Sequence, residues 1–181
     1  MLKKNVLVKS ISNLSDARYC AGMGVEFLAF ELDQDNEEFI GFDKIKEIKG
    51  WLIGPKIGGR VSKDFIDLST LKELNFDFII TDDEAAISHY KTGVAIVFLE
   101  TTHVKNEDAD AFILQSDDLV NAKNLEAAVP IFLESTKAVE LAEQIEEYST
   151  IEGLVLKGTH EERPGFSSYD QLMDILELLE E

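Results

Sequence analysis

Short apolar runs alternate along the chain with longer segments in which apolar residues recur at helical spacing. Each short run has about five to seven residues and is rich in Val, Ile, Leu and Phe, which is typical of parallel strands buried on both faces. We expect eight such strands, at residues 5–9, 26–32, 51–56, 76–81, 94–100, 111–115, 130–134 and 153–157.

Amphipathic segments between these runs predict helices. The clearest patterns cover residues 13–23, 62–74, 136–148 and 169–179, and weaker ones cover 37–48, 83–89 and 121–127. Ser12 or Asn13 is the expected N-cap of the first helix, and Ser62 is the cap candidate of the 62–74 helix. Residues 102–110 are too few and too polar for a full helix, so one connection should be reduced.

Strands that alternate with helices predict a parallel sheet with right-handed crossovers, and eight such units close into a barrel. The sequence therefore predicts a compact (β/α)8 TIM barrel with shortened loops, since 181 residues is fewer than the roughly 200–250 usual for this fold. An open, doubly wound sheet with fewer strands is the competing architecture. Because no linker or low-complexity stretch interrupts the pattern, we expect residues 1–181 to form a single domain.

The amino-acid composition argues against several classes of binding partner. The formal net charge of −19 argues against nucleic acid or an anionic membrane, because both require clustered Lys and Arg. No apolar stretch is long enough to span a bilayer, and the first residues resemble no signal peptide. The single cysteine, Cys20, excludes an intrachain disulfide and a cysteine metal cluster, and is expected to be a small buried residue. We expect a cytoplasmic protein without a cofactor.

Three segments resemble the phosphoribosylanthranilate isomerase family. Residues 8–17 read VKSISNLSDA, similar to the family's VKICG strand followed by ITNLEDA. Residues 153–171 contain Gly158, Glu161, Pro164 and Gly165 before a final amphipathic helix, similar to the family's closing phosphate loop, Glu and Pro-Gly. Residues 78–84, FIITDDE, faintly resemble the family's VQLHGDE without its His-Gly. The outer matches lie at the corresponding ends of the chain.

The resemblance implies an Amadori rearrangement, which needs a general acid and a general base at the C-terminal end of the barrel. In the family these are a Cys that ends strand 1 and an Asp that ends strand 6. Ser10 and Gln115 stand at the matching positions here. A serine hydroxyl does not ionise usefully near neutrality, and glutamine has no acidic proton to deliver. The chemistry that the resemblance implies is therefore not expected.

The family's substrate-anchoring loops differ as well. After strand 2, where the family has an Arg, residues 33–38 read DQDNEE, and these carboxylates would repel an anionic anthranilate. After strand 7, where the family has a Gly-Gly phosphate loop, residues 134–136 read EST. Only Lys157, Gly158 and Thr159 after strand 8, together with Lys9, keep a composition that suits a phosphate group. A tight structural turn is the competing interpretation.

Four other polar groups are candidates for the site. Asp117 and Asp118 are possible replacements for the missing acid, or helix caps, and His103 and His160 are possible acid–base groups in rim loops. Residues 54–60, GPKIGGR, match no nucleotide motif and are expected to form a rim loop after strand 3. The histidines lack metal-ligand spacing, so no metal site is expected.

Charged residues gather where the predicted strands end. We expect them to form either an ion-pair network that fills the mouth of the barrel or a site for a cation, with the network favoured. These residues are Lys9, Glu31, Asp33, Lys56, Asp82, Asp83, Glu100, Asp117, Glu134 and Lys157.

Three functions remain open at this point. The first is an isomerase-like barrel that has lost the activity and acts as a binding or interaction protein. The second is an active isomerase, or an enzyme on another small phosphorylated or cationic metabolite, that uses displaced catalytic groups. The third is an acidic module that binds a protein partner through its outer helices.

Overall fold

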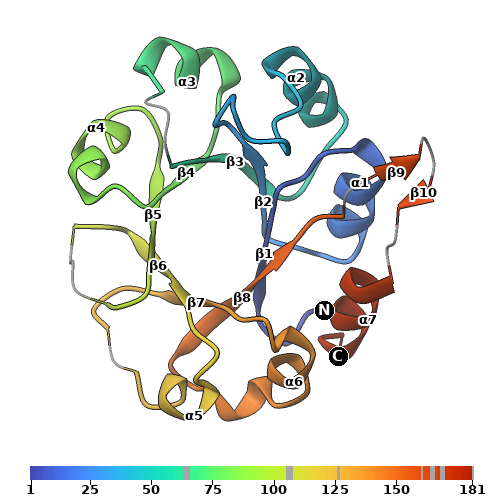
Figure 1. Cartoon of the computed structure of the whole chain (residues 1–181), viewed down its shortest axis with the longest axis vertical. Helices are drawn as coiled ribbons and strands as arrows, with labels where there is room; N and C mark the ends of the chain where they lie inside the picture. The colour runs from blue at the N-terminus through green and yellow to red at the C-terminus, as the bar shows by residue number, and fades with distance from the viewer. Residues whose placement is uncertain are drawn as a thin grey trace.

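The computed structural model describes residues 1–62, 66–104, 108–125, 127–159, 161–163, 166–167 and 170–180. Eight parallel strands form a closed barrel in which consecutive strands pair and β1 also pairs with β8 (Figure 1). The strands are β1 (Asn5–Lys9), β2 (Phe27–Glu31), β3 (Lys56–Val61), β4 (Phe78–Thr81), β5 (Ile96–Thr101), β6 (Ala111–Gln115), β7 (Ile131–Glu134) and β8 (Ile151–Lys157). The predicted (β/α)8 barrel is confirmed, and the open sheet is excluded.

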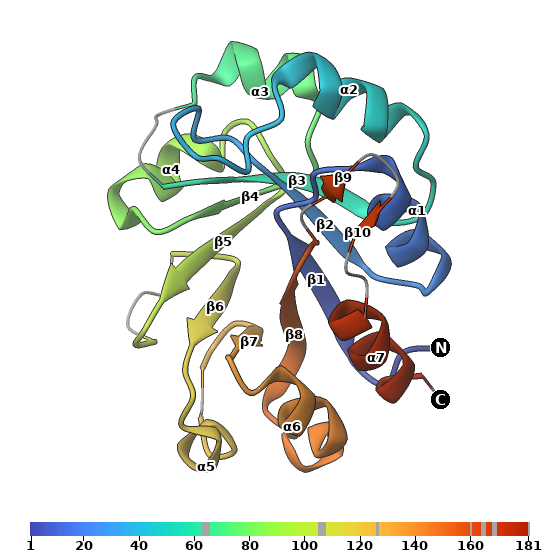
Figure 2. The same ribbon diagram turned by 45° about the vertical axis from the view of Figure 1, so that its right-hand side comes forward.

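Helices lie outside the ring of strands (Figures 1 and 2). They are α1 (Leu14–Gly22), α2 (Phe42–Gly50), α3 (Leu68–Leu74), η1 (Glu84–Ala86), α4 (Ile87–Tyr90), α5 (Leu119–Ala122), α6 (Ala138–Glu143), η2 (Ile145–Glu147) and α7 (Asp170–Leu178). As predicted, the connection from β5 to β6 is reduced, and its described residues contain no helix. An antiparallel pair, β9 (Glu161–Arg163) and β10 (Phe166–Ser167), precedes α7.

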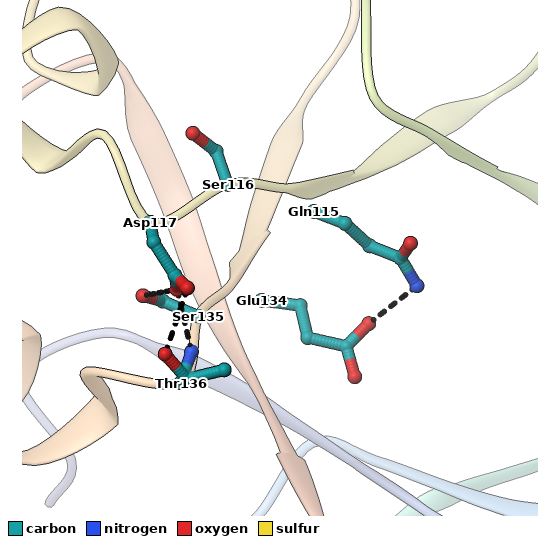
Figure 3. A pocket seen from close by; sticks show the side chains of 6 residues that line it. All are labelled: Gln115, Ser116, Asp117, Glu134, Ser135 and Thr136. Atoms are coloured by element: carbon teal, nitrogen blue, oxygen red, sulfur yellow. Dashed lines mark hydrogen bonds between the residues drawn. The ribbon is translucent and has the colours of Figure 1, made fainter.

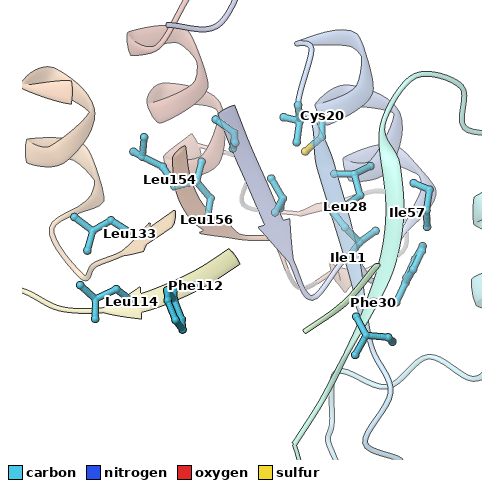
Figure 4. Close-up of a cluster of buried hydrophobic side chains, with 14 of the residues drawn as sticks. Ile11, Cys20, Leu28, Phe30, Ile57, Phe112, Leu114, Leu133, Leu154 and Leu156 are labelled. Atoms are coloured by element: carbon cyan, nitrogen blue, oxygen red, sulfur yellow. The ribbon is translucent and has the colours of Figure 1, made fainter. Parts of the chain in front are cut away.

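Side chains alternate along each strand between the inside and the outside of the barrel, which creates two apolar layers. Leu7, Phe27, Phe78, Phe98 and Phe132 belong to a buried cluster inside the barrel. The ring centroid of Phe27 lies 5.4, 5.3 and 5.7 Å from those of Phe78, Phe98 and Phe132, each in an edge-to-face arrangement. The intervening residues face outward and pack under the helices, where Figure 4 shows part of this larger cluster: Cys20, Leu28, Leu114, Leu133 and Leu154. The barrel is therefore a filled core with no open channel through this layer.

The predicted position of the third strand is wrong. Residues 51–56 were expected to be a strand and 54–60 a rim loop, but β3 begins at Lys56 and contains both Gly58 and Gly59. Glycine usually weakens a strand, which is why the pattern suggested a loop. Here a Cβ atom on Gly58 would lie 2.4 Å from the carbonyl oxygen of Phe78 and 2.6 Å from its ring. The absence of a side chain at Gly58 makes room for the aromatic layer.

Two helix starts also differ from the predictions by more than two residues. The second helix begins at Phe42 and not at residue 37, because residues 33–41 fold into a loop that ends at Gly41 with φ of 86°. The third begins at Leu68, and its cap is Asp67, whose carboxylate accepts from the N–H groups of Ser69 and Thr70. Ser62 is therefore not the cap. Asn13 caps α1 by accepting from the N–H of Asp16, as predicted.

The remaining strand predictions agree with the structure to within one or two residues at an end. No helix in the described part of the chain combines the length and apolar character needed to cross a bilayer.

Candidate functional site at the barrel mouth

Polar side chains replace apolar ones in the last inward-facing layer of the barrel. Each lies two residues beyond an inward-facing core position on the same strand, so the period of two directs it to the mouth, the end at which the parallel strands finish. Lys9 follows Leu7 in this way, and Glu100 follows Phe98. The other strand-end members of this layer are Glu31, Arg60, Gln115, Glu134 and Lys157.

Lys9 is the centre of an ion-pair network across this layer. Its Nζ lies 2.5 Å from Oε1 of Glu100 and 2.8 Å from Oε2 of Glu134. Arg60 continues the network, with Nε 2.8 Å from Oε2 of Glu100 and Nη1 3.2 Å from Oε2 of Glu31. The side chains of Lys9, Glu31 and Glu100 are 8%, 1% and 4% exposed. Paired charges from five strands, β1, β2, β3, β5 and β7, thus close the bottom of the mouth.

Burial sets the electrostatics of this floor. Desolvation raises the pKa of Glu31 above its ordinary value, although the backbone N–H of Asp33 and the guanidinium of Arg60 oppose the shift. Burial lowers the pKa of Arg60, but Glu100 and Glu31 outweigh that effect and the net shift is upward. Arg60 therefore stays charged, and the ion pairs are the reason that three carboxylates tolerate this position.

Gln115 joins the network through Glu134. Its side-chain amide donates to Oε2 of Glu134 at 3.1 Å, the same oxygen that contacts Lys9. The two residues line a pocket of about 390 Å³ at the ends of β6 and β7, together with Ser116, Asp117, Ser135 and Thr136 (Figure 3). Gln115 thus lies at the mouth, and its amide is engaged with a carboxylate.

Ser10 lies at the end of β1 in the left-handed backbone region, with φ of 57°. A non-glycine residue adopts this conformation at an energetic cost and mostly where neighbouring contacts hold it. Its Oγ donates to Oε2 of Glu38 at 2.5 Å, and the other oxygen of Glu38 pairs with Nζ of Lys157. Desolvation favours the neutral form of Glu38, but the hydrogen bonds from Lys157 and Ser10 outweigh it and lower its pKa. Glu38 is accordingly an anion.

Contacts within the protein also occupy the loop after β8. The N–H of Gly158 donates to the carbonyl oxygen of Lys9 at 2.7 Å. The N–H and Oγ1 of Thr159 donate to Oδ2 of Asp16, at 2.9 and 2.6 Å. Asp16 is fully buried in α1, so this contact fixes the loop to the helix. A pocket of about 240 Å³ lies beside it, lined by Ser10, Ser12, Glu38, Lys157, Gly158 and Thr159.

The charged residues predicted at the mouth do not all lie there. Lys56 begins β3 and pairs with Glu26 just before β2, so it lies at the opposite end of the barrel. That prediction followed from the wrong third strand. Asp118 is a helix cap, because its carboxylate accepts from the N–H of Asn121 at the start of α5. Asp117 instead binds Ser135 and Thr136 in the next loop.

Both aspartates are ionised. Hydrogen bonds from Ser135, the larger effect, and from Thr136 lower the pKa of Asp117. A hydrogen bond from the N–H of Asn121 lowers the pKa of Asp118. An aspartate with a lowered pKa holds no proton near neutrality, so neither residue suits the role of a general acid. His103 is exposed in the loop after β5, and His160 lies outside the described residues. Among the residues that the structure describes, no group of His, Cys, Asp and Glu is arranged to hold a metal ion.

Cys20 is buried in α1, away from the mouth (Figure 4). Desolvation, with a contribution from Asp16, raises the pKa of its thiol to about 12. At about pH 8 such a thiol holds on the order of a thousandfold less thiolate than an ordinary cysteine. We expect a disulfide reagent to modify Cys20 slowly in the folded protein and rapidly in denaturant, as followed by absorbance. Fast modification of the folded protein would contradict this assignment.

Sequence reasoning missed two residues of the mouth. Arg60 was assigned to a loop, although Ile57 and Val61 at even spacing from Gly59 indicate a strand in which Arg60 faces inward. Glu38 was noted only as part of an acidic loop, and its contacts with Ser10 and Lys157 depend on the folded path of residues 33–41. No local signal in the sequence predicts that path.

The fold and the mouth define a class: a (β/α)8 barrel whose mouth carries paired charged groups at the positions where barrels of this kind bind ligands. No family model matches the chain, and no curated protein matches its sequence. Similar proteins are found by comparing the fold with solved structures.

Solved phosphoribosylanthranilate isomerases share this fold across nearly the whole chain. One, in complex with reduced 1-(o-carboxyphenylamino)-1-deoxyribulose 5-phosphate, has a TM-score of 0.76 and 13% identity, covering 97% of this chain and 98% of that chain. TrpF from Jonesia denitrificans has a TM-score of 0.80 and 10% identity, covering 97% of this chain and 96% of that chain. N-(5'-phosphoribosyl)anthranilate isomerase from Pyrococcus furiosus has a TM-score of 0.70 and 15% identity, covering 97% of this chain and 98% of that chain. At these identities the likeness establishes the fold alone.

Proposed function

We propose that this protein is a phosphoribosylanthranilate isomerase-like barrel without the Amadori isomerase activity, which acts as a binding or interaction protein in the cytoplasm. The observation that carries the proposal is the pair of residues at the two positions where that chemistry needs a base and an acid. Ser10 donates to Glu38, and Gln115 donates to Glu134. Each donates to a carboxylate, and neither side chain ionises near neutrality.

The surroundings of Ser10 do not activate it as a base. A serine hydroxyl becomes nucleophilic or basic when a neighbouring group of suitable pKa removes its proton. The neighbour here is Glu38, whose lowered pKa makes it a weak proton acceptor. The acidic loop that carries Glu38 also opposes an anionic anthranilate ring.

A small phosphorylated metabolite is the proposed ligand, and Lys157 is the residue proposed to bind its phosphate. The donors of the other three candidates, Lys9, Gly158 and Thr159, already contact groups of the protein itself. Lys157, Gly158 and Thr159 border the same pocket of about 240 Å³. The side chain of Lys157 is 63% exposed, so it can turn toward a ligand. A protein partner is the other candidate for binding.

One observation favours an alternative function, an enzyme that uses displaced catalytic groups. Glu134 lines the pocket of about 390 Å³, and its side chain is 27% exposed while its Oε2 contacts Lys9. A carboxylate beside an ammonium at the floor of a pocket is an arrangement that supports proton transfer. The reaction would then centre on Glu134 and Lys9.

Complementation separates these functions. We expect the chain, expressed in a tryptophan-requiring strain that lacks the isomerase, to give no growth without tryptophan, while a known isomerase restores it. Soluble expression checked in the same cells makes the negative result meaningful. Growth at the rate of the known isomerase would refute the proposal. In that event Glu134→Gln should abolish growth and Asp35→Ala should not, if displaced groups perform the reaction.

A further inference from the structure

Two groups of hydrogen-bond donors at the mouth each surround one carboxylate of the chain itself. In the first group, Ser10 Oγ and Lys157 Nζ contact the two oxygens of Glu38. Glu38 belongs to the loop between β2 and α2, whereas its partners end β1 and β8. Because β1 lies between β2 and β8 in the barrel, the loop reaches over one strand to place this carboxylate.

The second group surrounds Asp117 in the pocket of about 390 Å³ (Figure 3). The Oγ of Ser135 and the N–H of Thr136 donate to Oδ1, and the Oγ1 of Thr136 donates to Oδ2, each at 2.8 Å. Asp117 follows β6 and its donors follow β7, so the contact again joins neighbouring loops across the mouth.

Backbone N–H groups, hydroxyls and a lysine ammonium are the groups that proteins use to bind phosphate and carboxylate anions. In barrels of this class, phosphate sites often form in the loops after strands 7 and 8. Ser135 and Thr136 follow β7, and Lys157 ends β8. Both groups of donors therefore have the composition and the location of an anion site, and each already holds an anion.

We infer that Glu38 and Asp117 are internal ligands, which keep two anion-binding groups of donors closed to small anions from solution. This inference deepens the proposed function, because it concerns how the same mouth admits a ligand. A metabolite with a phosphate or carboxylate group binds when one of these carboxylates moves out of its position. The mouth is then a site regulated by its own chain.

Exposure distinguishes these two carboxylates from a third. Asp117 is exposed, the side chain of Glu38 is 21% exposed, and a pocket lies beside each donor group, so each of these carboxylates has open space into which it is proposed to move. Asp16 also binds two donors of Thr159, but it is fully buried in α1 and cannot leave. Added phosphate should thus reach Ser10 and Lys157, or Ser135 and Thr136, in preference to the donors of Thr159.

The test measures binding of inorganic phosphate by calorimetry or phosphorus NMR at constant ionic strength. We expect the double variant Glu38→Ala/Asp117→Ala to bind phosphate at least about tenfold more tightly than the wild-type protein, because charge-assisted donors become available. Asp35→Ala is the matched control, since it removes an exposed carboxylate from the loop of Glu38 outside both donor groups. It should change the affinity less than about threefold, through long-range charge alone.

Several results would overturn the inference. One is equal phosphate affinity in the double variant and the wild-type protein. Another is an equal gain in phosphate affinity in Asp35→Ala. A third is phosphate binding that perturbs only Thr159. Circular dichroism checks folding, and if the alanine variant unfolds, Glu38→Gln/Asp117→Asn replaces it and should show a smaller gain. Phosphate binding is read without turnover, so isomerase activity in the wild-type protein would refute the proposed function while leaving this measurement to decide the inference separately.

Discussion

Lys9→Met is expected to lower the free energy of unfolding by about 3 kcal/mol, because removing one partner of a buried ion pair leaves the other charge uncompensated. Lys9 is the contact between Glu100 and Glu134, and the side chain of Glu100 is only 4% exposed. After the substitution Glu100 keeps Arg60 and Glu134 keeps Gln115, which places the expected loss near the lower end for such pairs. Urea unfolding at neutral pH measures the difference.

Lys44→Met is the matched control. Lys44 pairs with Glu47 on the surface, where the two side chains are 48% and 58% exposed, so the loss should stay below about 0.5 kcal/mol. The double variant Lys9→Met/Glu100→Gln should lose at least about 1 kcal/mol less than the sum of its single variants, because the unpaired carboxylate is removed with its partner. A loss of under about 1 kcal/mol in Lys9→Met would contradict the buried network.

Gly58→Ala should destabilise the barrel by about 3 kcal/mol, at the upper end for overpacking a core. Gly58 is the register partner of Phe78 on β4, and the added Cβ would meet both the carbonyl oxygen and the ring of that residue. The ring cannot retreat easily, since it packs edge-to-face against Phe27 and Phe98. Chemical denaturation of the purified variant gives the value.

Gly50→Ala provides the comparison. Gly50 is the last residue of α2, and its added Cβ would meet nothing within 4 Å. The substitution should be neutral or stabilise the protein by up to about 1 kcal/mol, because alanine is the better helix former. If Gly58→Ala proved as harmless as Gly50→Ala, the aromatic layer would not be packed as described.

Hydrophobic alternation was sufficient to predict the barrel, because each strand is a compact apolar run and each helix carries an apolar stripe. The error at β3 has a physical origin. Gly58 and Gly59 contribute no apolar side chain to the pattern, and the reason for Gly58 is Phe78, which lies on another strand. Propensity rules describe local preferences, whereas this position is decided by a tertiary contact.

The candidate site was predictable in part. The period of two places Lys9, Glu100 and Glu134 at the mouth, and the excess of carboxylates there favours pairing over isolated charges. The partners were not predictable, because Lys9 meets Glu100 from 91 positions away only after the barrel has closed. The same holds for Glu38, whose carboxylate reaches Ser10 and Lys157 through the path of a loop.

Acidic residues at the mouth oppose the binding of an anion by direct contact with its donors as well as by charge. The net charge of −19 repels anions at long range, and Glu38 and Asp117 in addition occupy the donor groups that we infer an external anion would use. Carboxylates at the mouth therefore affect binding in two ways, by long-range repulsion and by direct competition. The Asp35→Ala control separates the two.

The most direct test of the account is the isomerisation rate of the purified protein with freshly prepared phosphoribosylanthranilate, followed by fluorescence beside a known isomerase. We expect no conversion above the uncatalysed background, because the hydroxyl of Ser10 does not ionise near neutrality and Gln115 has no acidic proton to deliver. Turnover that co-purifies with the folded chain and disappears in Glu134→Gln would contradict it.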